Sequence, residues 1–139
     1  MKILHRLFAL FLVTGAVAIA TEVPKISPAD AVKHIMSGKA VLVDVREPDE
    51  WAESGVAAPA ILLPTSDFNG DQKLWKHFLK NNAGKEIILY CRSGNRSGKI
   101  AEKLAADGRT VANAGSFKDW AEAGLPVRQV EPKGSEPAR

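Results

Sequence analysis

Residues 86–97 read Glu-Ile-Ile-Leu-Tyr-Cys-Arg-Ser-Gly-Asn-Arg-Ser and contain the one cysteine of the chain, Cys91. The apolar run that ends at Cys91 is typical of a buried strand, and the polar, glycine-containing segment after it predicts a loop and then a helix that begins at Ser97. A strand that leads into a helix in this way directs backbone N–H groups and the positive end of the helix dipole toward the junction. Because these groups stabilise an anion, the segment predicts a lowered pKa for the Cys91 thiol.

The same segment carries two arginines close to the cysteine. A thiolate among cations and amide donors is nucleophilic at neutral pH, and the same groups would hold an anionic substrate. We therefore interpret Cys91 as a catalytic nucleophile. The six residues after it are the predicted substrate-binding loop: Arg92, Ser93, Gly94, Asn95, Arg96 and Ser97. The alternative is an inert core cysteine, since free cysteine is among the most buried residue types, but a core position does not need this loop.

Strand and helix patterns alternate along the chain on both sides of this segment. Residues 40–45 have the nearly continuous apolar composition of a strand covered on both faces. Residues 110–113 are a further candidate parallel strand, and residues 23–26 are a candidate edge strand. Predicted helices lie at 28–37, 47–51, 71–82, 97–107 and 117–123. This alternation predicts an α/β fold with a parallel sheet of about five strands and helices on both faces. Ligands of such sheets bind beyond the carboxyl ends of the strands, where Cys91 is expected.

Two of the predicted helices show an apolar stripe that should face the sheet. In the first helix the stripe comprises Ala31, Val32, Ile35 and Met36. In the helix at 71–82 it comprises Leu74, Trp75, Phe78 and Leu79. Both stripes are interpreted as core rather than as ligand sites.

Three motifs in order make the chain resemble the single-domain rhodaneses, which are thiosulfate sulfurtransferases. They are Val-Asp-Val-Arg-Glu at 43–47, the cysteine loop at 91–97, and Asn-Ala-Gly-Ser-Phe-Lys-Asp-Trp within 113–127. The resemblance implies a rhodanese-like domain at 21–130. It also implies that Asp44, Arg46 and Glu50 form an ion-paired corner that supports the loop. Val56 and Pro59 stand where the family usually has His and Gly, so the geometry of that turn stays open.

Cysteine phosphatases and arsenate reductases also place a thiolate in a loop that ends with arginine. Their loops have five residues between the cysteine and the arginine, whereas four lie between Cys91 and Arg96. A shorter loop makes a smaller cradle, which suits a cysteine persulfide better than a tetrahedral phosphate. Among sulfurtransferases, those that use mercaptopyruvate tend to have small neutral loop residues, and cations favour thiosulfate, whose leaving group is the anion sulfite.

The resemblance therefore implies transfer of the outer sulfur of thiosulfate through a Cys91 persulfide to cyanide or a thiol. No cofactor or metal is expected, because one cysteine and three histidines show no ligand spacing. Two other interpretations stay open. The chain could be a sulfur carrier that acts with a protein partner and turns over little free thiosulfate, or a thiol sensor that forms mixed disulfides.

Residues 1–20 comprise a basic head with Lys2 and Arg6, an apolar stretch of about 14 residues, and Ala18-Ile-Ala20 as a small-x-small cleavage site. This pattern predicts a cleaved signal peptide and a periplasmic protein with no membrane segment after cleavage, since the stretch is shorter than a spanning helix. Without Lys2 and Arg6, 17 of the 19 basic residues remain against 16 acidic ones, so the net charge of the mature chain is +1. A charge this small gives no reason to expect nucleic-acid binding. Residues 131–139 predict a disordered tail.

Overall fold

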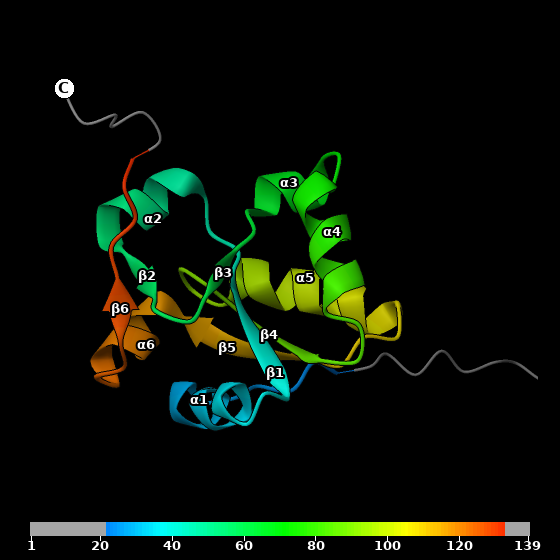
Figure 1. Cartoon of the computed structure of the whole chain (residues 1–139), viewed down its shortest axis with the longest axis horizontal. Helices are drawn as coiled ribbons and strands as arrows, with labels where there is room; N and C mark the ends of the chain where they lie inside the picture. The colour runs from blue at the N-terminus through cyan, green and yellow to red at the C-terminus, as the bar shows by residue number, and fades with distance from the viewer. Residues whose placement is uncertain (1–21, 133–139) are drawn as a thin grey trace, which may run out of the picture.

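The computed structural model describes residues 22–132 (Figure 1). The predicted signal peptide and all but the first two residues of the predicted tail lie outside the described residues. No helix in the described part is long and apolar enough to cross a membrane. The helices are α1 Pro28–Met36, α2 Pro48–Ser54, α3 Thr65–Asn69, α4 Lys73–Asn81, α5 Asn95–Ala106 and α6 Phe117–Glu122. The strands are β1 Ala40–Asp44, β2 Val56–Ala57, β3 Ile61–Leu62, β4 Glu86–Cys91, β5 Val111–Ser116 and β6 Val127–Arg128.

Four parallel strands form the main sheet, in the order β3-β1-β4-β5. The predicted edge strand at 23–26 lies beside β5, where it makes a single bridge between Lys25 and Asn113. Pro24 has no N–H group to donate to the sheet. Its carbonyl accepts a hydrogen bond from the Asn113 amide. The predicted α/β fold is confirmed, and the fifth strand position is reduced to this bridge.

The helices cover both faces of the main sheet, as Figure 1 shows for α1 on one side and α3, α4 and α5 on the other. Alternate residues of the central strands point to opposite faces of the sheet. Leu89 therefore packs on the side of α3, α4 and α5, and Ile88 packs on the side of α1. Trp75 of α4 and Trp120 of α6 are both fully buried, one in each core. These two cores hold β4 rigidly, and β4 is the strand that ends at Cys91.

A two-stranded antiparallel sheet, β2 with β6, was not predicted from the sequence. The Arg128 side chain donates to the carbonyls of Ala58 and Ala60, which fastens the end of the domain to this turn. Gly55, with a φ of 76°, ends α2 before this turn, and Pro59 within the turn does not have a positive φ. Val56, which stands where the family usually has histidine, is fully buried.

The helix predictions were right in position and wrong in some boundaries and faces. Met36 and Leu74 were expected in the core, but they are 82% and 51% exposed. Leu74 is adjacent in sequence to the buried Trp75, so it projects about 100° away around the helix. Helix α3 was missed because five residues are too few for a periodic pattern. Helix α5 begins at Asn95, two residues before its predicted start.

Candidate active site

Cys91 is the last residue of β4, at the carboxyl end of a central parallel strand. Only three residues, 92–94, separate it from α5, because Gly94 adopts a left-handed conformation with a φ of 90° and serves as the N-cap. Asn95, Arg96 and Ser97, which were predicted as loop residues, therefore form the first turn of α5. The N-terminus of this helix lies at the cysteine, as the sequence pattern indicated.

The Cys91 sulfur accepts hydrogen bonds from two groups of this turn. The Gly94 amide donates at 3.0 Å, and the Ser97 hydroxyl lies 3.5 Å from Sγ. Burial alone would raise the pKa of the thiol, since the residue has no exposed surface. Hydrogen bonds from the Ser97 side chain and from the amides of Ser97, Ser93 and Gly94 outweigh burial, so the pKa of Cys91 is lowered. A lowered pKa favours the nucleophilic thiolate.

The guanidinium of Arg96 forms a bidentate ion pair with Glu50 of α2, with N···O distances of 2.7 and 2.8 Å. The hydrogen bond from Arg96 lowers the pKa of Glu50 to about 2, against the opposing effect of its burial. The pair joins α2 to the first turn of α5. Substrate binding by Arg96 thus stays a prediction. The contact that the structure shows for its guanidinium is the one with Glu50.

Asp44 and Arg46 form the expected buried corner, with Arg46 donating to both carboxylate oxygens of Asp44 at 2.7 to 3.1 Å. The guanidinium also donates to the Ser54 hydroxyl and the Gly55 carbonyl. It lies 4.4 Å from the centre of the Phe117 ring, a cation–π contact that joins α6 to the corner. Glu50 was predicted to belong to this corner, but its ion pair is with Arg96.

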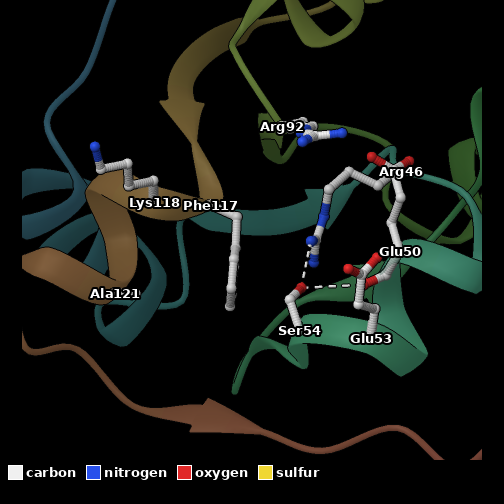
Figure 2. Close-up of a pocket in the computed structure, with 8 residues that line it drawn as sticks. All are labelled: Arg46, Glu50, Glu53, Ser54, Arg92, Phe117, Lys118 and Ala121. Carbon is white, nitrogen blue, oxygen red and sulfur yellow. Dashed lines mark hydrogen bonds between the residues drawn. The ribbon is translucent and has the colours of Figure 1, made fainter.

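A pocket of about 360 Å³ opens between α2 and α6 beside the cysteine loop (Figure 2). Arg92 lies at one end of it, with Lys118 and Phe117 on one side and Glu53 and Ser54 on the other. Arg92 is exposed, so its charge is available to a ligand. Lys118, Phe117 and Glu53 were not predicted as site residues, because nothing in the local pattern shows that α6 and α2 face one another.

Asn113 was also missed, and it holds the back of the cysteine turn. Its side-chain amide donates to the Gly94 carbonyl at 2.9 Å, and its oxygen accepts from the Ser97 hydroxyl at 2.8 Å and the Gly115 amide at 3.0 Å. The signal that could have found it is a polar residue within the apolar run Val-Ala-Asn-Ala at 111–114 of β5. Of the predicted loop residues, Ser93 is exposed, as is Arg92, whereas Ser97 is buried.

Metal-ligating side chains do not cluster in this site. Within residues 22–132, no group of three or more His, Cys, Asp or Glu side chains is arranged to hold a metal ion.

Comparison with known proteins places this geometry in a family. The chain is 38% identical over 89 residues to the uncharacterized protein slr1261 of Synechocystis, an alignment that covers 63% of this chain and 46% of that protein. It is 33% identical over 93 residues to the thiosulfate:glutathione sulfurtransferase of Saccharomyces cerevisiae, which covers 60% of this chain and 66% of the yeast protein. The chain thus spans about half of the first relative and two thirds of the second.

A solved structure matches the fold over most of the described residues. The rhodanese-related protein of Thermoplasma volcanium superposes with a TM-score of 0.64 at 30% identity, over 77% of this chain and 99% of that one. The family model described as "Rhodanese-like domain" matches residues 27–123, which run from the N-cap of α1 to the end of α6 and include Cys91 and its loop. By its sequence and its fold, the chain belongs to the rhodanese-like domain family.

Proposed function

We propose that the chain is a thiosulfate sulfurtransferase that carries the outer sulfur of thiosulfate as a Cys91 persulfide. Family membership supports sulfur transfer in general. The observation that carries the proposal is that the Gly94 amide and the Ser97 hydroxyl both face the Cys91 sulfur, at 3.0 and 3.5 Å. Hydrogen bonds of this turn lower the pKa of the thiol. The name of the yeast relative describes transfer from thiosulfate to a thiol, which is the same reaction class.

In the first step the Cys91 thiolate attacks the outer sulfur of thiosulfate. A new sulfur–sulfur bond forms, the bond between the two thiosulfate sulfurs breaks, and sulfite leaves with the electron pair of that bond. The product is an anionic Cys91 persulfide. The Gly94 amide and the Ser97 hydroxyl, which face Sγ in the free enzyme, are placed to stabilise that anion.

In the second step an acceptor attacks the outer sulfur of the persulfide. Cyanide gives thiocyanate and a thiolate acceptor gives a new persulfide, and in both cases the Cys91 thiolate is regenerated. The two half-reactions share one enzyme form, so ping-pong kinetics are expected. No electron or proton is left over in either step.

The choice of thiosulfate rests on charge. Thiosulfate is a dianion and its leaving group is a dianion, so cations beside the sulfur lower the barrier for the first step. With Arg96 paired to Glu50, the cations that line the pocket from the loop and from α6 are Arg92 and Lys118. We expect Arg92 to hold the sulfonate oxygens, because it directly follows the nucleophile.

A second candidate function is a sulfur carrier that exchanges with a protein partner and turns over little free thiosulfate. The observation that favours it is the burial of Cys91, which has no exposed surface, so that a donor reaches Sγ only after the loop shifts. A partner that displaces the loop would serve this purpose. The carrier would still form a Cys91 persulfide, but its turnover with thiosulfate and cyanide would be slow.

We also propose that the chain acts in the periplasm. The support is the pattern of residues 1–20, a basic head, an apolar stretch and a small-x-small site before Thr21. Fractionation of cells that express the full chain, followed by N-terminal sequencing, tests this. A chain found in the cytoplasm with residues 1–20 intact would contradict it.

The experiment that tests the reaction is intact mass measurement of the reduced protein before thiosulfate, after thiosulfate, and after cyanide. The expected result is a gain of one sulfur atom that cyanide removes. Cys91→Ser is the control and should gain nothing, because an unactivated serine hydroxyl stays protonated at neutral pH and is too weak a nucleophile to displace sulfite. Absence of any gain in the wild-type protein, with Cys91 open to alkylation, would contradict the thiosulfate proposal.

A further inference from the structure

The side chain of Asn113 touches both of the groups that donate to the Cys91 sulfur. Its Nδ2 donates to the carbonyl of Gly94, and its Oδ1 accepts from the hydroxyl of Ser97. Gly94 contributes its amide to the sulfur at 3.0 Å and Ser97 its hydroxyl at 3.5 Å. One amide from the neighbouring strand β5 therefore sets two donors that come from α5 and its cap.

The turn packs closely against β5 at two glycines. A Cβ at Gly94 would lie 3.3 Å from the Cα of Gly115, and a Cβ at Gly98 would lie 3.2 Å from the Nδ2 of Asn113. The Asn113 backbone is fixed as well, because its amide and carbonyl bond to Pro24 and Ile26 in the edge segment. The backbone and the side chain of Asn113 are thus both held by hydrogen bonds.

The Ser97 hydroxyl has one proton and two acceptors within reach. The amide oxygen of Asn113, at 2.8 Å, is a better acceptor than a neutral thiol at 3.5 Å. A thiolate is charged, and charge-assisted hydrogen bonds are the stronger ones, so ionisation of Cys91 favours rotation of the hydroxyl toward sulfur. Asn113 is not left without a donor when this happens, because its oxygen keeps the Gly115 amide at 3.0 Å.

We propose that Asn113 is a positioning residue for sulfur transfer, because its side-chain amide holds both of the groups that donate to the Cys91 sulfur. The role of Asn113 in sulfur transfer rests on the proposed function. Its effect on the Cys91 thiol does not depend on which compound donates the sulfur. The side-chain hydrogen bonds of Asn113 go to Gly94, Ser97 and Gly115. It acts through Gly94 and Ser97.

An asparagine is required here rather than an aspartate. The carboxylate introduced by Asn113→Asp would face the Gly94 carbonyl oxygen without a proton between them, and would hold the Ser97 proton more tightly than an amide does. It would also add a negative charge near the thiolate. The other charged groups around the turn include Arg92, Arg96 with Glu50, Asp119, which bonds to Ser116, and Lys25 of the edge segment, and the substitution removes none of them.

The test is titration of the thiol in Asn113→Asp, followed by the ultraviolet absorbance of the thiolate and by the pH dependence of alkylation. The chain has one cysteine, so both signals report on Cys91 alone. We expect the midpoint to rise by about one pH unit, and persulfide formation to slow about tenfold at a pH below both midpoints. Asn82→Asp is the matched control: Asn82 also donates its side-chain amide to a backbone carbonyl, that of Phe78, at 2.9 Å, but at the end of α4.

An unchanged midpoint in folded Asn113→Asp would overturn the proposal, as would an equal rise in Asn82→Asp. If Asn113→Asp does not fold, Asn113→Ser decides: it is neutral and too short to reach Gly94, so a smaller rise supports the proposal and no rise overturns it. Sulfur uptake by the wild-type protein separates the two ideas. No uptake from thiosulfate with a raised midpoint in Asn113→Asp would contradict the thiosulfate proposal and leave the role of Asn113 standing.

Discussion

Glu50 and Arg96, 46 residues apart in the chain, form a bidentate ion pair with N···O distances of 2.7 and 2.8 Å. The pair fastens α2 to the first turn of α5, next to the Cys91 sulfur. It also neutralises one of the two arginines of the cysteine loop. Electrostatic attraction of an anionic donor is therefore left mainly to Arg92, which is exposed and lines the pocket.

The ion pair makes stability depend on acid pH. The pKa of Glu50 is about 2 in the folded chain against an ordinary 4.5, so the pair stabilises the fold above pH 4.5 and this contribution is lost as the pH falls toward about 2. We expect Glu50→Gln to lower the free energy of unfolding at neutral pH by about 1 to 2 kcal/mol, allowing for the partial exposure of the pair. The free energy of unfolding of this variant should also fall less steeply as the pH drops below 4.5, the part of the curve called the acid limb here.

Chemical denaturation across this pH range measures the effect. Gln keeps the shape of the side chain and an acceptor for the Glu47 amide, so the cap of α2 is preserved. Asp49→Asn removes a neighbouring exposed carboxylate of the same helix and is the control, with little change expected. An acid limb as steep in Glu50→Gln as in the wild-type protein would show that the pair does not set it.

Arg92 and Arg96 should differ in what their loss affects. Arg92→Ala should raise the KM for thiosulfate about tenfold or more, the worth of one charge-assisted hydrogen bond, with an unchanged melting temperature. Arg96→Ala should lower the melting temperature, because it leaves the Glu50 carboxylate unpaired. Steady-state kinetics and thermal melts measure both. Lys99→Ala, which removes another cation of α5, is the control, and a KM that is unchanged in Arg92→Ala would mean that Arg92 does not bind the donor.

Gly94 and Gly38 share a positive φ, 90° and 75°, but differ in their surroundings. Alanine at either position carries the cost of a left-handed conformation, about 1 to 2 kcal/mol. Only Gly94→Ala also presses on Gly115, at 3.3 Å, whereas a Cβ at Gly38 meets nothing within 4 Å. We expect Gly94→Ala to lose persulfide formation, measured by intact mass, and Gly38→Ala to keep it at similar stability. Full activity in Gly94→Ala would show that the turn tolerates displacement.

Asp44 and Arg46 are a buried pair, with side chains 0% and 4% exposed. Removing one partner leaves the other buried without its counter-charge, so Asp44→Asn should destabilise the fold by about 3 to 5 kcal/mol. Denaturant unfolding measures this. Asp71→Asn breaks the contact with Lys73, an exposed pair at 3.7 Å, and should cost less than about 1 kcal/mol. Equal losses in the two variants would contradict the view that burial decides the value of the pair.

Local patterns in the sequence predicted the parts of the site that are close together in the chain. The apolar run of β4 and the glycine after it placed Cys91 at a strand end facing a helix N-terminus, and both features are present. The start of α5 was misplaced by two residues, because Gly94 caps the helix in a left-handed conformation that the residue pattern does not reveal. Met36 and Leu74 were misassigned because an apolar residue beside a core stripe looks the same in sequence as a member of it.

The sequence by itself determined the alternation of strands and helices, the buried strand that ends at Cys91, and the cations and amides that follow it, because these depend on residue type and short-range spacing. Only the tertiary structure decided which side chains meet there. Arg96 meets Glu50, and Asn113 supports Gly94 and Ser97 from the adjacent strand. Such contacts depend on how helices pack on the sheet and which strands are neighbours, and no local pattern encodes that geometry.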